Sequence, residues 1–197
     1  MVQIGLRMVS LMGNIPSTKL RGCDFDDQDF STLTAVAAQY IDTGISIYDK
    51  PACAPADIAL QARAWQLSGG LDLLFVDYLT RLTPDDPTES RTREVGRMVQ
   101  AMKTLAKSLN IPVVLLAQLN RSVETRSDKR PIMADLRDSG EIEQEADVVA
   151  FLYREAVYDE NSDPEAAEII IEKNRHGPCA TVKCRFIAEQ MRWVNYG

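Results

Sequence analysis

The chain has 197 residues, of which 45% are hydrophobic and 26% are charged, as in an ordinary globular protein with a sizeable core. A net charge of -7 argues against a domain that coats nucleic acid with a broad basic surface. No apolar run approaches the ~18 residues of a membrane span and the N-terminus has no cleavage pattern, so we expect a cytoplasmic protein without a membrane partner.

The charges are unevenly distributed along the chain. From Arg121 to Arg137 there are five basic residues against three acidic, and from Asp138 to Glu172 there are twelve acidic against one basic. Any contact with phosphate should therefore come from the stretch ending near Arg137 or from backbone amides. The four cysteines form no CxxC pair and His176 is the only histidine, which favours reduced cysteines over a zinc site.

The first third of the chain is predicted to be helical. Apolar residues near helical spacing predict three helices, over residues 2–12, 27–44 and 55–68. Asp27 or Asp29 would cap the second helix, and Gly69 with Gly70 would end the third. The short run Ile45 to Tyr48 is strand-like.

The rest of the chain alternates strands and helices before it turns to hairpins. Short apolar runs predict strands covered on both faces at 71–79, 113–116 and 148–153, with a helix through 95–109 and a long loop at 120–139. Shorter strands follow at 169–173, 181–187 and 191–194. The fold class is therefore α/β, with inner parallel strands and C-terminal antiparallel hairpins.

Two polar side chains end neighbouring predicted strands. Asp77 closes LLFVD and Gln118 closes VVLLAQ, and ligands of open α/β sheets sit at the carboxyl ends of strands. An aspartate there can hold a magnesium ion beside nucleotide phosphates, and a glutamine can sense a phosphate or orient water. Taken singly, each also fits a turn cap or a solvated strand end.

Two further segments could contact phosphate. In the loop from Asp135 to Gly140, Gly140 permits an unusual backbone angle, and exposed amides with one arginine would form a small phosphate nest. In the Lys173-Asn174-Arg175 turn, two cations could reach a neighbour's nucleotide and neutralise charge in the transition state. In isolation, a helix-capping turn and an ordinary basic hairpin tip are the more common explanations of these two segments.

Together these segments resemble the C-terminal, RecA-like motor domain of the DnaB helicases. The resemblance covers residues 2 to 196 and rests on LLFVDYLTRL, on the stretch from REVGRMVQAMKTLAKSLNIPVVLLAQLN to ADLRDSGEIEQEADVVAFLYR, and on IIIEKNRHGP. It implies a hexameric ring that moves 5′ to 3′ along single-stranded DNA, with ATP and Mg²⁺ bound between subunits.

The resemblance also implies roles at matching positions. Asp77 would be the Walker B aspartate that positions the magnesium ion, and Gln118 would couple the state of the nucleotide to the DNA loop. The DNA backbone would be held by the loop that carries Arg137, Asp138 and Gly140. Lys173 and Arg175 would act in trans on ATP bound by the adjacent subunit, with Arg175 as the arginine finger.

The sequence departs from the family at the phosphate-binding loop. The family needs GxxxxGK[ST], and no Gly-Lys pair occurs in the 197 residues. The strand that carries the catalytic glutamate would precede the first helix here, the collar domain is absent, and Thr80 stands where the family often has glutamine. We therefore expect a partial RecA-like P-loop NTPase core over residues 1–197 that is inactive alone. It is either an incomplete gene product, such as a split or truncated reading frame, or a piece that an upstream fragment completes.

Three functions remain to be compared. The first is the motor of a replicative DNA helicase, in a homo-hexamer or a hetero-oligomer with intact helicase subunits. The second is a catalytically incomplete module that binds DNA or docks onto helicase subunits. The third, another RecA-like ATPase such as a recombinase, is disfavoured by DLRDSGEIEQEADVVAFLYR.

Overall fold

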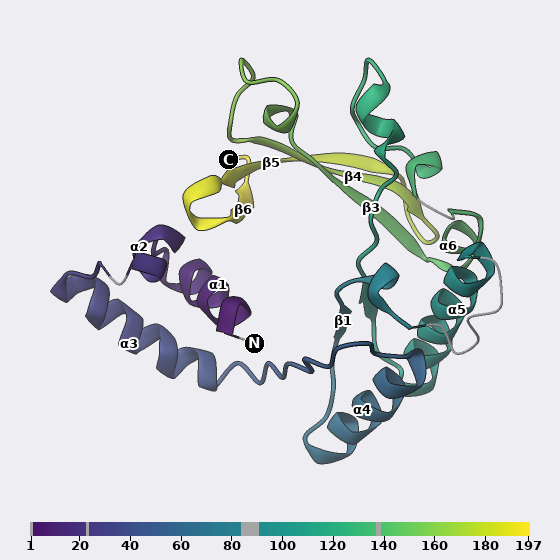
Figure 1. Cartoon of the computed structure of the whole chain (residues 1–197), viewed down its shortest axis with the longest axis horizontal. Coiled ribbons are helices and arrows are strands. Elements are labelled where there is room, and N and C mark those ends of the chain that lie inside the picture. The colour runs from purple at the N-terminus through teal and green to yellow at the C-terminus, as the bar shows by residue number, and fades with distance from the viewer. Residues whose placement is uncertain (1, 23, 84–90, 137–138) are drawn as a thin grey trace. The chain divides into compact units, whose positions relative to one another are not determined.

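A computed structural model describes residues 2–22, 24–83, 91–136 and 139–197 (Figure 1). The helices are α1 (Val2–Gly13), α2 (Ser17–Gly22), α3 (Asp27–Ile41), α4 (Pro55–Ser68), α5 (Arg91–Leu109) and α6 (Ser139–Glu145). The strands are β1 (Leu74–Val76), β2 (Val113–Leu115), β3 (Val148–Tyr153), β4 (Ala166–Asn174), β5 (Ala180–Ile187) and β6 (Arg192–Asn195). The chain divides into two compact units.

The strands form two sheets. Strands β1 and β2 pair in parallel, with Leu74 opposite Val113 and Val76 opposite Leu115. The second sheet has the order β3-β4-β5-β6, and its last two strands are antiparallel. The α/β fold class, with a parallel inner pair and antiparallel C-terminal strands, is thus confirmed. Strand β3 begins the second sheet and does not extend the parallel pair.

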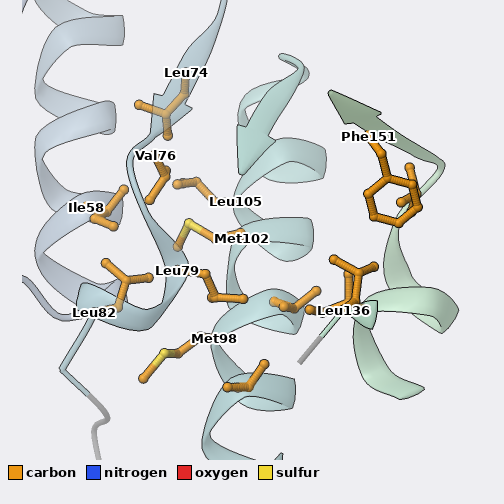
Figure 2. Packing of buried hydrophobic residues seen from close by; sticks show 14 of the residues in the cluster. Ile58, Leu74, Val76, Leu79, Leu82, Met98, Met102, Leu105, Leu136 and Phe151 are labelled. Carbon is orange, nitrogen blue, oxygen red and sulfur yellow. The ribbon is translucent and has the colours of Figure 1, made fainter. Parts of the chain in front are cut away.

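The larger unit comprises Lys50–Tyr153 and Ile170–Thr181, and α5 is the centre of its core. One face of α5 buries Val95, Met98, Met102 and Leu105 at the three- and four-residue spacing of a helix. Figure 2 shows Met102 and Leu105 beside Leu74 and Val76 of β1 and Ile58 of α4, with Phe151 of β3 on the other side of α5. The helix therefore packs against strands of both sheets.

The expectation that the inner strands are covered on both faces is wrong for these residues. Strand β3 alternates exposed and buried side chains along its whole length. In β1 the central residue, Phe75, is 63% exposed between two buried neighbours. The buried face packs against α4 and α5, and the opposite face keeps an apolar composition while it remains exposed. A continuous apolar run cannot reveal this asymmetry, since both faces have the same side-chain chemistry.

The smaller unit comprises Met1–Asp49, Arg154–Ile169 and Val182–Gly197. Helix α3 is capped by Asp26, one residue before the predicted Asp27, and Asp29 completes the capping box by accepting from the Asp26 amide. Ser10 of α1 is fully buried and donates to the carbonyl of Ile15 at 2.6 Å. Residues 45–48 have no strand structure, so the strand-like run there is a wrong prediction, and α2 was not anticipated.

Candidate functional site

Asp77 and Gln118 lie at the same edge of the parallel pair. Asp77 follows the last residue of β1 directly, and Gln118 lies three residues beyond the end of β2. Hydrogen bonding continues past the strand ends: the amide of Leu116 donates to Val76 at 3.0 Å, and the amide of Leu79 donates to Leu116 at 2.9 Å. The two residues therefore emerge from adjacent, in-register segments at the carboxyl ends of the strands.

Both side chains are exposed at this edge. Within the described parts of the chain, no side-chain hydrogen bond or ion pair is found for the Asp77 carboxylate or the Gln118 amide. An open carboxylate of this kind fits a magnesium ion, which is commonly bound by one or two carboxylates together with phosphate and water oxygens. The arrangement can supply one oxygen ligand and one amide to a nucleotide at the sheet edge.

The two cations predicted to act together, Lys173 and Arg175, lie at the end of β4, and both contact the C-terminal end of α6. Lys173 Nζ donates to the carbonyl of Glu143. Arg175 Nη2 donates to the carbonyl of Gln144 at 3.0 Å. The last carbonyls of a helix have no partner within the helix, and basic side chains satisfy them well. The end of the β4–β5 hairpin is therefore attached to α6.

Asp147, which the sequence analysis did not single out, joins this contact to α5. Its Oδ1 lies 3.1 Å from Arg175 Nη1, and its backbone carbonyl accepts from the Arg175 amide at 2.8 Å. Its other oxygen accepts from Lys103 Nζ. The hydrogen bond from Lys103, followed by the charges of Lys103 and Arg175, lowers the pKa of Asp147 below its usual value. The partners are 44 and 28 residues away, so no local pattern marks them.

The segment between Gln118 and α6 was predicted as a long loop, and one ion pair, Arg126 with Asp135, lies at its centre. Arg126 holds Asp135 with two hydrogen bonds, of 3.1 and 2.8 Å, and the Asp135 side chain is only 4% exposed. Asp135 also accepts from the amide of Ile132 at 2.9 Å. Two short 3₁₀ helices, Arg121–Thr125 and Met133–Asp135, form around this pair.

The predicted DNA-binding residues are only partly described. Arg137 and Asp138 lie outside the described residues. Gly140 is exposed within α6, and it is absent from the described glycines with positive φ, which are Gly44, Gly70 and Gly197. The expectation that Gly140 serves an unusual backbone angle is therefore wrong, because the residue is part of a helix.

A pocket of about 440 Å³ brings one predicted DNA-binding residue and one predicted trans-acting residue together. Its lining consists of residues from α6, β4 and the preceding 3₁₀ helix: Met133, Gly140, Glu143, Gln144, Glu172 and Lys173. Gly140 of α6 and Lys173 of β4 thus line the same pocket.

Across the residues that the structure describes, no helix is both long and apolar enough to cross a membrane.

Comparison with known proteins identifies many relatives. The chain is 40% identical over 195 residues to the replicative DNA helicase DnaB of Geobacillus stearothermophilus, covering 98% of this chain and 43% of that protein. It is 39% identical over 197 residues to the corresponding helicase of Haemophilus influenzae, covering 98% of this chain and 42% of the relative. The chain thus spans less than half the length of these curated relatives.

Solved structures agree with these sequence relatives. One solved ATPase domain superposes with a TM-score of 0.92 at 35% identity, covering 97% of this chain and 69% of that chain. A DnaB-like replicative helicase, solved in a study of its interactions with primase, has a TM-score of 0.92 at 34% identity over 98% of this chain and 47% of that chain. The profile of the DnaB-like helicase C-terminal domain matches residues 1–195, and the chain belongs to this family.

Proposed function

We propose that this chain is part of the motor of a replicative DNA helicase, which uses ATP to move along single-stranded DNA and unwind the duplex. The observation that carries the proposal is the parallel register of β1 and β2, which brings Asp77 and Gln118 to one sheet edge. Membership of the DnaB-like helicase family supports this interpretation, since the relatives with 39–40% identity are named replicative DNA helicases.

In this proposal, Asp77 holds the magnesium ion that accompanies ATP, and Gln118 responds to the γ-phosphate. When bound, the ion neutralises charge that develops on the phosphate oxygens. The chain's own task at the sheet edge is to fix the backbone from which Asp77 extends, which β1 does through its hydrogen bonds to β2 and its buried neighbour Val76. Gln118, on the adjacent segment, couples the presence or loss of the γ-phosphate to the conformation of the residues that follow it along the chain.

Lys173 and Arg175 act on the nucleotide of a neighbouring subunit in this proposal. An arginine presents a planar fork of donors that matches phosphate oxygens, and one supplied in trans can complete an active site. This requires a ring, either a homo-hexamer or a hetero-oligomer with intact helicase subunits. The support is that both cations are at the end of one hairpin and that the Arg175 side chain is 46% exposed.

Arg137, Asp138 and Gly140 hold the backbone of single-stranded DNA in this proposal. The support is their place in the sequence, at the end of the stretch with an excess of basic residues, and the exposure of Gly140. A grip through amides and one arginine in each subunit needs no strongly basic domain, which agrees with a net charge of -7. Base preference should be weak, because a backbone contact does not read bases.

The phosphate-binding loop is proposed to come from an upstream segment, so that residues 1–197 form a partial RecA-like domain. The 197 residues contain no Gly-Lys pair, and the matching ATPase domain is covered over only 69% of its length. Exposed apolar side chains on β1, β2 and β3, or directly after β2, support the same idea, since they are available to a further layer of structure: Phe75, Val114, Leu116, Val148 and Leu152.

The test is ATP hydrolysis and duplex unwinding by the purified chain, with and without an upstream fragment that carries a phosphate-binding loop. We expect activity only with the fragment. Asp77→Asn should lower kcat on the order of a hundredfold or more, because the metal ligand is worth several kcal/mol in the transition state. Asp72→Asn is the matched control: Asp72 is an exposed aspartate just before β1, at the opposite end of the strand.

The two other outcomes are also informative. Single-stranded DNA binding without ATP hydrolysis, in a folded chain with the fragment present, would favour the incomplete binding module. Equal loss of activity in Asp77→Asn and Asp72→Asn would remove Asp77 from the metal site, because the effect would not depend on the end of the strand.

A further inference from the structure

At the end of the β4–β5 hairpin, Arg175 is the last of three charged side chains that contact one another in a row. Lys103, on α5, is bonded to one oxygen of Asp147, and Arg175 is bonded to the other at 3.1 Å. The Lys103 side chain is only 17% exposed, so it anchors the row at the side of the central helix. The Asp147 carboxylate is thereby fixed from one side and presents its second oxygen to Arg175.

Arg175 is restrained in direction and yet remains accessible. One terminal nitrogen donates to Asp147 and the other donates to the carbonyl of Gln144 at 3.0 Å. The backbone amide of Arg175 donates to the Asp147 carbonyl at 2.8 Å, which fixes the start of the side chain as well. A guanidinium has five N–H donors, so these two side-chain bonds leave donors free for a further anion.

We propose that Asp147, held by Lys103, is a positioning residue that orients the Arg175 guanidinium toward the nucleotide of the neighbouring subunit. This inference rests on the proposed function, in which Arg175 acts in trans. A free arginine side chain samples many rotamers, and holding it in one direction removes that entropy cost before the reaction. Misplacement by about 1 Å can cost on the order of a hundredfold in rate.

The position of Asp147 also connects the orientation of Arg175 to helix α6. Asp147 lies between the end of α6, at Glu145, and the start of β3, at Val148. Helix α6 has seven residues, and its other end carries Gly140 of the proposed DNA loop. The carbonyls of Glu143 and Gln144 near its C-terminal end bind Lys173 and Arg175. A shift of α6 on binding DNA would therefore move the groups that orient Arg175.

The kinetic test uses the chain with the fragment that supplies the phosphate-binding loop. Asp147→Asn should lower kcat for ATP hydrolysis about tenfold and leave KM for ATP unchanged, because orientation matters in the transition state. In an Arg175→Ala background, Asp147→Asn should have no further effect on kcat. A purely structural role of Asp147 would lower activity further in that background.

Two variants control for charge and for folding. Asp57→Asn removes a carboxylate that is ion-paired with Lys50 at 2.8 Å and for which no arginine partner is found among the described residues, and it should keep kcat within twofold of the wild type. Asp147→Glu keeps the charge and should recover part of the lost rate. If Asp147→Asn does not fold, Lys103→Met provides the same test from the other partner, again with a lowered kcat in the wild-type background and no effect beside Arg175→Ala.

A second measurement is independent of activity. Nitrogen-15 NMR of the arginine side chains should show slow rotation of the Arg175 guanidinium in the wild-type chain. Rotation should become fast in Asp147→Asn and stay slow in Asp57→Asn. Fast rotation in the wild type, or no change in Asp147→Asn, would overturn the inference.

The outcomes separate this inference from the function on which it rests. If Arg175→Ala leaves ATP hydrolysis unchanged, the proposed trans role fails and the positioning role fails with it. If Arg175→Ala abolishes hydrolysis while Asp147→Asn does not lower kcat, only the positioning role fails. A rise in kcat for Asp147→Asn would also overturn it, because Asp147 would then restrain Arg175 away from the nucleotide.

Discussion

The sheet edge and the hairpin end present their charged groups in opposite ways. At the sheet edge, Asp77 is exposed, and no side-chain partner is found for it among the described residues. At the hairpin end, Lys173 and Arg175 are each bonded to α6, and Arg175 is also bonded to Asp147. A carboxylate that receives a metal ion has to keep its oxygens free, whereas a long cation that reaches a fixed point benefits from support by its own chain.

The largest effect should come from removing the hairpin arginine. With the upstream fragment present, Arg175→Ala should lower kcat for ATP hydrolysis on the order of a thousandfold, the lower end of the range for an arginine finger. Arg175→Lys should recover little, because a lysine has a compact charge and no planar fork. Steady-state kinetics at saturating ATP provide the measurement.

The control for this change is Arg185→Ala. Arg185 is about as exposed as Arg175 and is likewise paired with one carboxylate, that of Glu165. Its loss should leave kcat within twofold. An equal loss in both variants would mean that the hairpin arginine has only a structural role, and the contrast with the sheet edge would disappear.

The segment that joins the two regions should be the next most sensitive. Arg126→Ala leaves the buried carboxylate of Asp135 without its charged partner, and an uncompensated buried charge costs about 3 kcal/mol. Urea denaturation should show this loss in the free energy of unfolding. Arg121→Ala, at an exposed position of the same segment, should change stability by about 0.5 kcal/mol or less. Similar values for the two variants would mean that the ion pair does not organise the segment.

The packing of α6 against α5 allows a smaller test of the hairpin side. A methyl group at Gly96 of α5 would lie 2.6 Å from Cγ and 3.2 Å from Cβ of Glu141 in α6, so the two helices would have to move apart. Gly96→Ala should therefore destabilise the protein by about 1 kcal/mol, despite the better helix propensity of alanine. At Gly5 of α1, an added methyl group would have no described neighbour within 4 Å outside the adjacent backbone. Gly5→Ala should therefore stabilise the protein by about 0.5 kcal/mol.

Thermal unfolding compares these two glycine variants directly. Opposite signs would support a close approach of α6 to α5 that depends on glycine. A stabilising effect of both would show that Glu141 rotates away at no cost, and that α6 is not held in place by this contact.

The sheet edge could be predicted from sequence because its signal is local. Each apolar run ends in one polar residue, and the parallel order of strands follows from the intervening helix, so Asp77 and Gln118 could be placed together without coordinates. The hairpin pair could be named from its residue types and from a family resemblance. The contact of Arg175 with Asp147, and that of Asp147 with Lys103, could not be predicted, since these residues meet only when α5, α6 and β4 have packed.

Burial was predicted less well than the order of elements. The alternation of exposed and buried side chains in β3 cannot be read from VVAFLY, because both faces are apolar. Likewise, the polar segment before α6 has no periodicity, and its order comes from the Arg126–Asp135 ion pair across nine residues. The two findings have the same cause: the sequence pattern shows the chemistry of the side chains, whereas burial and local order depend on what packs against them.

The smallest expected effect is the acid sensitivity of the hairpin contact. The pKa of Asp147 is lowered first by the hydrogen bond from Lys103 and then by the charges of Lys103 and Arg175. A carboxylate whose pKa falls on folding contributes stability above its unfolded value of about 3.9, and this contribution is lost as the pH falls through the folded value. Because Asp147 is about half exposed, the contribution should be below about 1 kcal/mol.

Thermal unfolding of the wild type and of Asp147→Asn at two pH values measures this contribution. The wild type should be more stable than the variant at pH 7, and the difference should shrink as the pH falls below about 3.9 and vanish once the pH is below the lowered pKa of Asp147, where the wild-type carboxyl is neutral as well. Lys103→Met should show the same convergence, since it removes the principal cause of the lowered pKa. A difference that stays constant with pH would assign the contribution of Asp147 to packing, and the hairpin would then be held by its backbone bonds, as the sheet edge is.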